Sequence, residues 1–177
     1  MFPSRTKMYI CAIEDSEYFQ RKICFWDNVC GFDLKPIKNW ALLEPLIETC
    51  PEKQIVTDDS TLIEFDLNKV KSEDLAFKAP FKLYPLEPIK CHAFVVWFDV
   101  TFEGPENTVL LTTSPFEAPT HWTQTIFYLN EPVQLDDEHP IEGFFHIKPN
   151  DVNPRDQDIT IEFSVLGKQY IQHYKMR

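Results

Sequence analysis

The chain has 177 residues, which is enough for one sizeable domain with a shared hydrophobic core. Apolar residues make up 44% and aromatic residues 14%, a content that favours a packed, mainly β core over disorder or a helical bundle. The net charge of −11 disfavours nucleic acid as a direct partner, because phosphate binding needs a basic surface. Basic partners fit this charge better; the alternative is that the acidity serves only solubility.

No stretch approaches the roughly 20 apolar residues of a membrane span, and no apolar run follows the first residues to form a secretory signal. We therefore expect no membrane partner. The five cysteines are odd in number, scattered and never spaced as CxxC, which argues against a disulfide framework and against a metal site. Free thiols point to a reducing compartment, so we expect the cytoplasm, the nucleus or both.

The first predicted element is a strand over residues 7–13, with apolar side chains on both faces that indicate burial on both sides. A helix follows, capped by Asp15 or Ser16 and ending near Gly31. Its apolar face has helical spacing and comprises Phe19, Ile23, Trp26 and Cys30. A second helix runs over residues 35–43 with a proline in its first turn, so the region up to residue 50 is a helical excursion.

From about residue 54 the pattern changes to period two and predicts eight strands. They cover residues 61–67, 81–84, 92–102, 109–113, 123–129, 141–147, 158–166 and 168–174. The longest alternates cleanly, with Phe94 and Val96 on a face toward a core and Trp97 and Asp99 on the other. The predicted fold is mainly β: an antiparallel β-barrel, distorted and sandwich-like, with an inserted helical arm.

Catalytic motifs are scarce: there is no Gly-rich nucleotide loop, no HExxH and no nucleophile elbow. This argues against a self-sufficient enzyme. His92 and His146 lie within predicted strands, where a neutral structural role is favoured. One loop stands out, because residues 119–122 place an imidazole between a hydroxyl and a large aromatic ring. A purely structural interpretation has this loop anchored by a buried tryptophan, with the histidine exposed and the threonine capping a turn.

Thr120-His121-Trp122, followed by residues 123–128 (TQTIFY), resembles the threonine-histidine-tryptophan loop and the next strand of type I protein arginine N-methyltransferases. Further matches occur in the family's order, and they are residues 12–15, 25–33, 44–46, 73–75, 114–115, 148–150, 153–156 and 174–177. The resemblance covers nearly the whole chain and identifies it as the C-terminal half, the β-barrel with its dimerisation arm. An unrelated β-sandwich binding domain would require all these matches to be accidental.

In that family an N-terminal half binds S-adenosylmethionine and supplies paired glutamates, and the enzyme methylates arginine in proteins such as histones and RNA-binding proteins. The resemblance implies that His121 is catalytic through an acidic partner from that half, and that Thr120 and Trp122 bind substrate. Neither the nucleotide motif nor the glutamate loop is present here, so we expect this chain to bind no cofactor and to be inactive alone. Whether it counts as an enzyme stays open; the alternative is a stand-alone regulatory or dimer-partner module.

The resemblance divides the chain into residues 1–15 (interdomain crossing and first strand), 16–50 (arm) and 51–177 (barrel). The resemblance implies a cis peptide at the junction Phe2-Pro3, with a return to trans in the absence of a preceding part as the alternative, and Met1 is expected to be a truncation point. The arm implies a homodimer, with candidate contacts at Phe19, Phe25, Trp26, Trp40 and Leu43. The alternative is that these residues pack the arm on itself or on the barrel. Arginine-rich protein substrates would suit the acidic loops, which otherwise are simply solvated.

Overall fold

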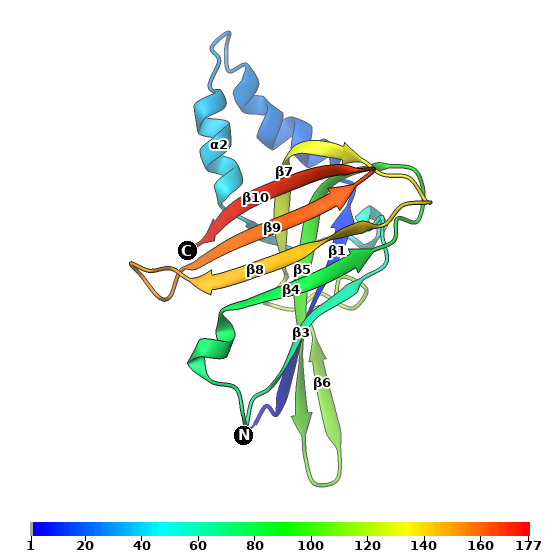
Figure 1. The fold of residues 1–177 in the computed structure, drawn as a ribbon, viewed down its shortest axis with the longest axis vertical. Coiled ribbons are helices and arrows are strands. Elements are labelled where there is room, and N and C mark those ends of the chain that lie inside the picture. Colours follow the sequence, from blue (N-terminus) through cyan, green and yellow to red (C-terminus); the bar gives the residue numbers. More distant parts are fainter. Residues whose placement is uncertain (1) are drawn as a thin grey trace.

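A computed structural model describes residues 2–177 (Figure 1). Within this range the chain forms ten strands and two α-helices, joined by short helical turns. The strands are β1 (Arg5–Ile13), β2 (Leu46–Glu48), β3 (Ser60–Asp66), β4 (Phe77–Leu83), β5 (Lys90–Glu103), β6 (Thr108–Thr112), β7 (Gln124–Gln134), β8 (Ile141–Pro149), β9 (Gln157–Val165) and β10 (Lys168–Met176). The helices are α1 (Ser16–Tyr18) and α2 (Lys35–Leu43).

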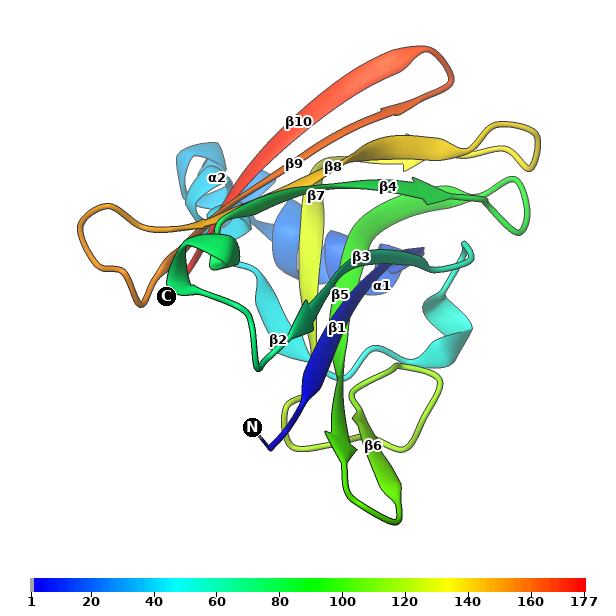
Figure 2. The ribbon, with the colours of Figure 1, turned by 60° about the horizontal axis from the view of Figure 1, so that its bottom comes forward.

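The strands form two antiparallel sheets that pack face to face (Figure 2). The six-stranded sheet has the order β2-β7-β5-β1-β3, with β6 paired to the far end of β5, and the four-stranded sheet has the order β10-β9-β8-β4. Phe94, Phe127 and Phe163 are among the buried side chains that fill the space between the sheets. The predicted mainly β, antiparallel architecture is confirmed.

The middle of the six-stranded sheet is buried on both faces. Ile10 of β1 and Phe94 of β5 point into the core between the sheets. Cys11 of β1 and Trp97 of β5 point the other way, into a second core that also contains Phe19 of the arm. Burial of residues 7–13 on both sides was predicted; for β5 the prediction of a single core face was incomplete, because the second core covers the opposite face as well.

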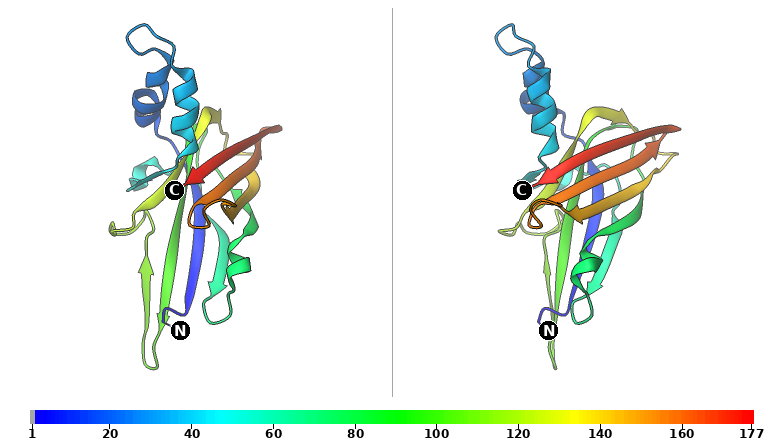
Figure 3. Two further views of the ribbon diagram at one scale, coloured as in Figure 1. Left: turned by 90° about the vertical axis from the view of Figure 1, so that its left-hand side faces the viewer. Right: turned by 60° about the vertical axis from the view of Figure 1, so that its left-hand side comes forward.

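The helical arm extends from one end of the molecule, opposite the β5–β6 hairpin (Figures 1 and 3). Its first helix starts at α1, continues as a π-helical turn over Phe19–Ile23 and ends in a 3₁₀ turn over Cys24–Asp27, earlier than the predicted end at Gly31. Because a π turn takes in an extra residue, the residues after it rotate off the predicted apolar face. Cys30 is accordingly exposed and lies with Gly31 in a tight turn between the two helices.

The segment after α2 returns to the barrel, which the sequence did not predict. Leu46–Glu48 forms β2, an edge strand paired with the start of β7. The expected arm, residues 16–50, thus includes a strand that belongs to the six-stranded sheet. No helix among the described residues is long and apolar enough to cross a membrane.

At the N-terminus the peptide between Phe2 and Pro3 is cis, as the resemblance implied. The expectation for Met1 concerns a residue outside those described. Phe2 contacts Phe102 of β5 edge-on, with ring centroids 5.1 Å apart.

Close packing on β8 gives a test of the two-sheet core. A Cβ on Gly143 would meet the Glu162 carbonyl oxygen, the Phe81 ring at 2.8 Å and the Phe163 Cβ at 2.9 Å. We expect Gly143→Ala to lower the free energy of unfolding by about 3 kcal/mol, since overpacking forces neighbouring strands apart. Urea denaturation measures this.

Gly31→Ala is the matched control, because it meets no atom within 4 Å and only its positive φ opposes the change. We expect a loss of about 1 kcal/mol there. Equal losses at the two glycines would contradict the packing argument.

Candidate functional site

The connection between β6 and β7, residues 113–123, carries the predicted substrate loop. It projects from the face of the six-stranded sheet that points away from the four-stranded sheet (Figure 3). Phe116 of this loop packs edge-on against Trp97, at 6.1 Å between centroids. The Trp97 ring in turn stacks on Tyr9, at 5.4 Å. The loop therefore rests on an aromatic floor supplied by β1 and β5.

Electrostatics under the loop are set by Tyr9 and Asp99. Partial burial and a hydrogen bond to the Asp99 carboxylate raise the pKa of Tyr9 to about 12, so this phenol stays neutral. The Lys7 ammonium lies 4.9 Å from the centre of the same ring. The floor thus presents neutral aromatic surface with one carboxylate at its edge.

The three predicted site residues lie at the end of the loop, just before β7. His121 is exposed and Trp122 is 55% exposed, and their rings approach edge-on with centroids 6.1 Å apart. Exposure of Trp122 contradicts the structural interpretation in which a buried tryptophan anchors the loop. Within residues 2–177 the side-chain hydroxyl of Thr120 is buried without a hydrogen-bond partner, so it caps no turn. His121 and Trp122 are therefore presented outward.

Two buried polar residues, which sequence reasoning missed, hold the ends of the loop. The Thr113 hydroxyl donates to the Phe98 carbonyl (2.8 Å) and accepts from the Phe98 N–H (3.0 Å), which fixes the start of the loop on β5. The Gln124 side chain, only 3% exposed, fixes the end of the loop. A polar residue that alternates normally within a strand gives no sequence signal for such a role.

A polar cluster at the base of the arm joins it to the barrel. Asp15 caps the first helical turn by accepting the Tyr18 N–H (3.2 Å), and its other oxygen accepts the Tyr128 hydroxyl (2.6 Å). The Asp15 N–H donates to Nδ1 of His92 (3.2 Å), an imidazole that is 4% exposed. Because Nδ1 accepts this bond, His92 is neutral in this arrangement. The predicted structural role of His92 agrees with these contacts.

The candidate dimer contacts fall into two groups. Trp40 is 79% exposed, Phe25 and Leu43 are also exposed, and Trp26 is half-buried beneath the Phe25 ring, with centroids 5.2 Å apart. Phe19 is buried instead in the core between arm and barrel. For Phe19 the structure favours the alternative, packing on the barrel, because its side chain is covered within the chain.

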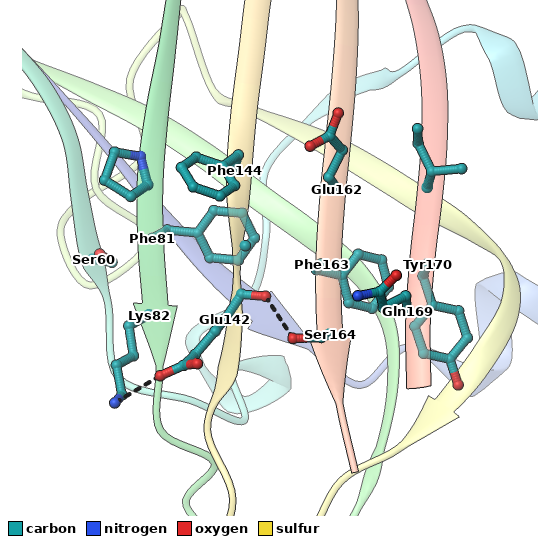
Figure 4. Close-up of a pocket in the computed structure, with 13 residues that line it drawn as sticks. Ser60, Phe81, Lys82, Glu142, Phe144, Glu162, Phe163, Ser164, Gln169 and Tyr170 are labelled. Carbon is teal, nitrogen blue, oxygen red and sulfur yellow. Dashed lines mark hydrogen bonds and ion pairs between the residues drawn. The ribbon is translucent and has the colours of Figure 1, made fainter. Parts of the chain in front are cut away.

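A separate hollow of about 930 Å³ lies on the four-stranded sheet (Figure 4). Its lining includes Pro80, Phe144 and Ile171, and Glu142 forms an ion pair with Lys82 at 2.8 Å. None of its lining residues belongs to the loop 113–123. The hollow is therefore not the substrate site that the loop indicates.

The structure is an antiparallel two-sheet domain that carries a helical arm and presents a histidine and a tryptophan on one loop. The chain belongs to the arginine methyltransferase oligomerization subdomain family, whose model matches residues 4–168. This match confirms the resemblance to the C-terminal half of a type I protein arginine N-methyltransferase.

Similar proteins cover the whole chain but extend beyond it. Protein arginine N-methyltransferase 1.1 of Arabidopsis thaliana is 40% identical over 181 residues, which span 100% of this chain and 46% of that protein. Protein arginine N-methyltransferase 1 of Caenorhabditis elegans is 40% identical over 168 residues, 95% of this chain and 48% of that protein. The chain spans about half the length of these curated relatives.

A solved structure has the same fold. The Trypanosoma brucei PRMT1 enzyme-prozyme heterotetrameric complex with AdoHcy matches with a TM-score of 0.96 and 36% identity, covering 100% of this chain and 57% of that one. The observed barrel and arm are thus those of this family.

His92 gives the arm contact a defined pH dependence. Burial lowers the pKa of His92 in the folded chain, and the Lys90 charge lowers it further. The charges of Glu14 and Asp15 and the hydrogen bond to the Lys90 backbone raise the pKa, but burial outweighs them. The unfolded chain therefore takes up the proton first, near its ordinary value of about 6.5. Stability from neutral His92 is present above that pH and is lost as the pH falls through it.

We expect the free energy of unfolding to fall by roughly 1 kcal/mol between about pH 7.5 and 5.5 because of His92. His92→Asn, whose Oδ1 can accept the Asp15 N–H but does not titrate, should remove this part of the decrease. Urea titrations at both pH values provide the measurement, with His121→Asn at the exposed loop as control. An unchanged pH dependence in His92→Asn would contradict the prediction.

Proposed function

We propose that this chain is the substrate-side barrel and oligomerisation arm of a protein arginine N-methyltransferase. The observation that carries the proposal is the outward presentation of His121 and Trp122 on a loop fixed at both ends to a rigid sheet. The same tripeptide supplied the sequence resemblance, and the curated relatives are named for this activity. Because the chain spans about half of those relatives, methyl transfer requires a second, cofactor-binding part.

The proposed reaction moves a methyl group from the sulfonium sulfur of S-adenosylmethionine to a guanidinium nitrogen: the S–C bond breaks, an N–C bond forms and the nitrogen loses one proton. His121 helps to move that proton, in a pair with a carboxylate from the cofactor-binding part. Trp122 offers its ring face to the guanidinium, a favourable cation–π contact. Thr120 lies next to His121 on the same loop, with its own hydroxyl buried.

We assign no cofactor-binding residue to this chain. A dinucleotide-type site needs a Gly-rich loop between a strand and a helix N-terminus. Gly31, Gly104 and Gly167 lie in turns and Gly143 lies within β8, so the glycines present do not form such a loop. The residues of this chain therefore do not fit S-adenosylmethionine, and we propose that the chain alone is inactive.

The proposed partners follow from charge and exposure. A net charge of −11 favours association with arginine-rich protein substrates through long-range attraction. The exposed aromatic residues of the arm favour a second subunit, and the similar trypanosomal structure is a heterotetrameric complex. Five free cysteines support a reducing location, cytoplasm or nucleus.

A chimera tests the activity directly. These 177 residues would replace the matching segment of the Arabidopsis relative, and transfer to a Gly-Arg-rich peptide would be assayed for chimera and chain alone. We expect an active chimera and no transfer by the chain. His121→Ala should lower kcat about 100-fold, since a positioned acid–base group contributes at least that much.

His139→Ala, an exposed histidine on the turn before β8, is the control and should leave kcat and KM unchanged. Full activity in the His121→Ala chimera would reject the catalytic role. Transfer by the chain alone would reject the need for a second part.

The exposed apolar side chains of the arm predict that the chain associates with itself. With Phe25, Trp40 and Leu43 exposed, the chain should form oligomers that increase with concentration. Trp40→Ser should weaken association about 30-fold, as expected for a central aromatic contact. Sedimentation velocity measures this, with Val152→Ser on the exposed β8–β9 loop as control. A strict monomer at high concentration would contradict the prediction.

A second candidate is a non-catalytic partner module that clasps a full-length homologue through the arm. It is favoured by the likeness to the trypanosomal assembly, which is an enzyme-prozyme complex. The two candidates differ in the chimera assay: a folded but inactive chimera, together with binding of the chain to the intact Arabidopsis relative, would favour the partner role.

A further inference from the structure

One buried side chain connects the substrate loop with the end of the arm. Gln124 is the first residue of β7 and directly follows the loop. Its Oε1 accepts the N–H of Cys50 at 2.7 Å, and its Nε2 donates to the carbonyl of Thr113 at 2.7 Å. Thr113 begins the loop, so the amide joins the two ends of the loop and links both to Cys50.

Cys50 belongs to the return segment of the arm. Between α2 and Cys50 the chain forms β2, and this strand pairs with β7 at the residues that leave the loop, with Glu48 opposite Gln124 and Leu46 opposite Ile126. At the other end of the segment, Leu42 of α2 is buried in the core shared by arm and barrel. A short, paired segment therefore joins α2 to the root of the loop.

The first part of the loop is held by hydrogen bonds to Ser114 and by the contact of Phe116 with Trp97, whereas the last part has one backbone bond, from Thr123 N–H to the Thr120 carbonyl at 3.3 Å. The hydroxyls of Thr120 and Thr123 are buried and, within the described residues, have no hydrogen-bond partner. Thr123 also has a positive φ of 51°, an unfavourable conformation for a β-branched residue. The conformation of residues 120–123 consequently depends on the anchored end at Gln124.

An amide is the side chain suited to this place. It offers a donor and an acceptor in one plane, and both are used here while the residue is 3% exposed. A carboxylate has no donor for the Thr113 carbonyl, and an apolar side chain of equal length has neither group, which leaves buried backbone atoms unpaired.

We propose that Gln124 is a positioning residue that couples the arm to the substrate loop, so that seating of the arm on a second subunit sets the order of Thr120, His121 and Trp122. This inference rests on the proposed function for the role of the loop. The coupling itself is a property of this chain and is independent of methyl transfer.

Amide hydrogen exchange on the 177-residue chain tests the connection. In Gln124→Met, exchange should accelerate about tenfold both at Cys50 and across residues 114–123, because both ends lose their shared bond. Strands β9 and β10 should be unchanged. The control is Gln134→Met, at the opposite end of β7, whose side-chain amide donates to the carbonyls of Ile89 and Leu135. An unchanged loop, or equal acceleration throughout the sheets, would overturn the proposal.

Gln124→Glu separates a specific role from general loss of structure. A protonated carboxyl group reproduces the donor and acceptor of the amide, whereas the buried carboxylate lacks the donor. Exchange rates of the loop and Cys50 in Gln124→Glu are compared with wild type at the same pH. At low pH they should be close to the wild-type rates, and at high pH they should be about tenfold faster. Exchange that is equally fast at both pH values would reject the specific role.

A double-mutant cycle tests transmission from the arm. Leu42→Ala loosens α2 on the barrel and should accelerate exchange of the loop when Gln124 is present, but add nothing in the Gln124→Met background. Additive effects would show that arm and loop are independent. Because these experiments need no catalysis, their failure rejects the coupling alone, whereas an inactive chimera rejects the proposed function alone.

Discussion

Burial of β1 and β5 on both faces is the constraint on which the rest of this structure depends. Each large apolar side chain removed from water contributes about 1.5–3 kcal/mol, so neither face of these strands can stay solvated. The four-stranded sheet covers one face. The base of the arm and the β6–β7 connection cover the other. The arm and the loop 113–123 are therefore parts of one folded unit.

The strands that alternate in sequence were predicted well, because a period of two follows from pleated geometry. Leu46–Glu48 was missed: three residues directly after a proline are too short to show a period, and only pairing with β7 makes them a strand. The second core face of β5 was missed for a related reason. Its cover comes from Phe19 and Leu42, which are distant in sequence, and a local pattern cannot show which segment will cover a strand.

The candidate site was found by resemblance more than by physics. Residue chemistry alone selected the same loop as the resemblance but placed Trp122 inside the protein, since large aromatic side chains are usually buried. Its 55% exposure makes sense for a surface that another protein segment covers. Gln124 and Thr113 gave no signal, because their importance lies in bonds to backbone atoms at Cys50 and Phe98 that only the folded chain brings near.

The cysteine thiols of the chain differ in reactivity, because one lies exposed in the tight turn of the arm and others are buried. Burial raises the pKa of Cys50 and of Cys91 to about 12, and that of Cys11 well above its usual range, so these three thiols, on or beside the barrel, stay protonated and covered. Cys30 is exposed in the turn between the two helices of the arm. An alkylating dye would therefore label this turn of the arm in preference to the barrel. The natural sequence thus carries its own attachment point for a spectroscopic reporter of whatever the arm touches.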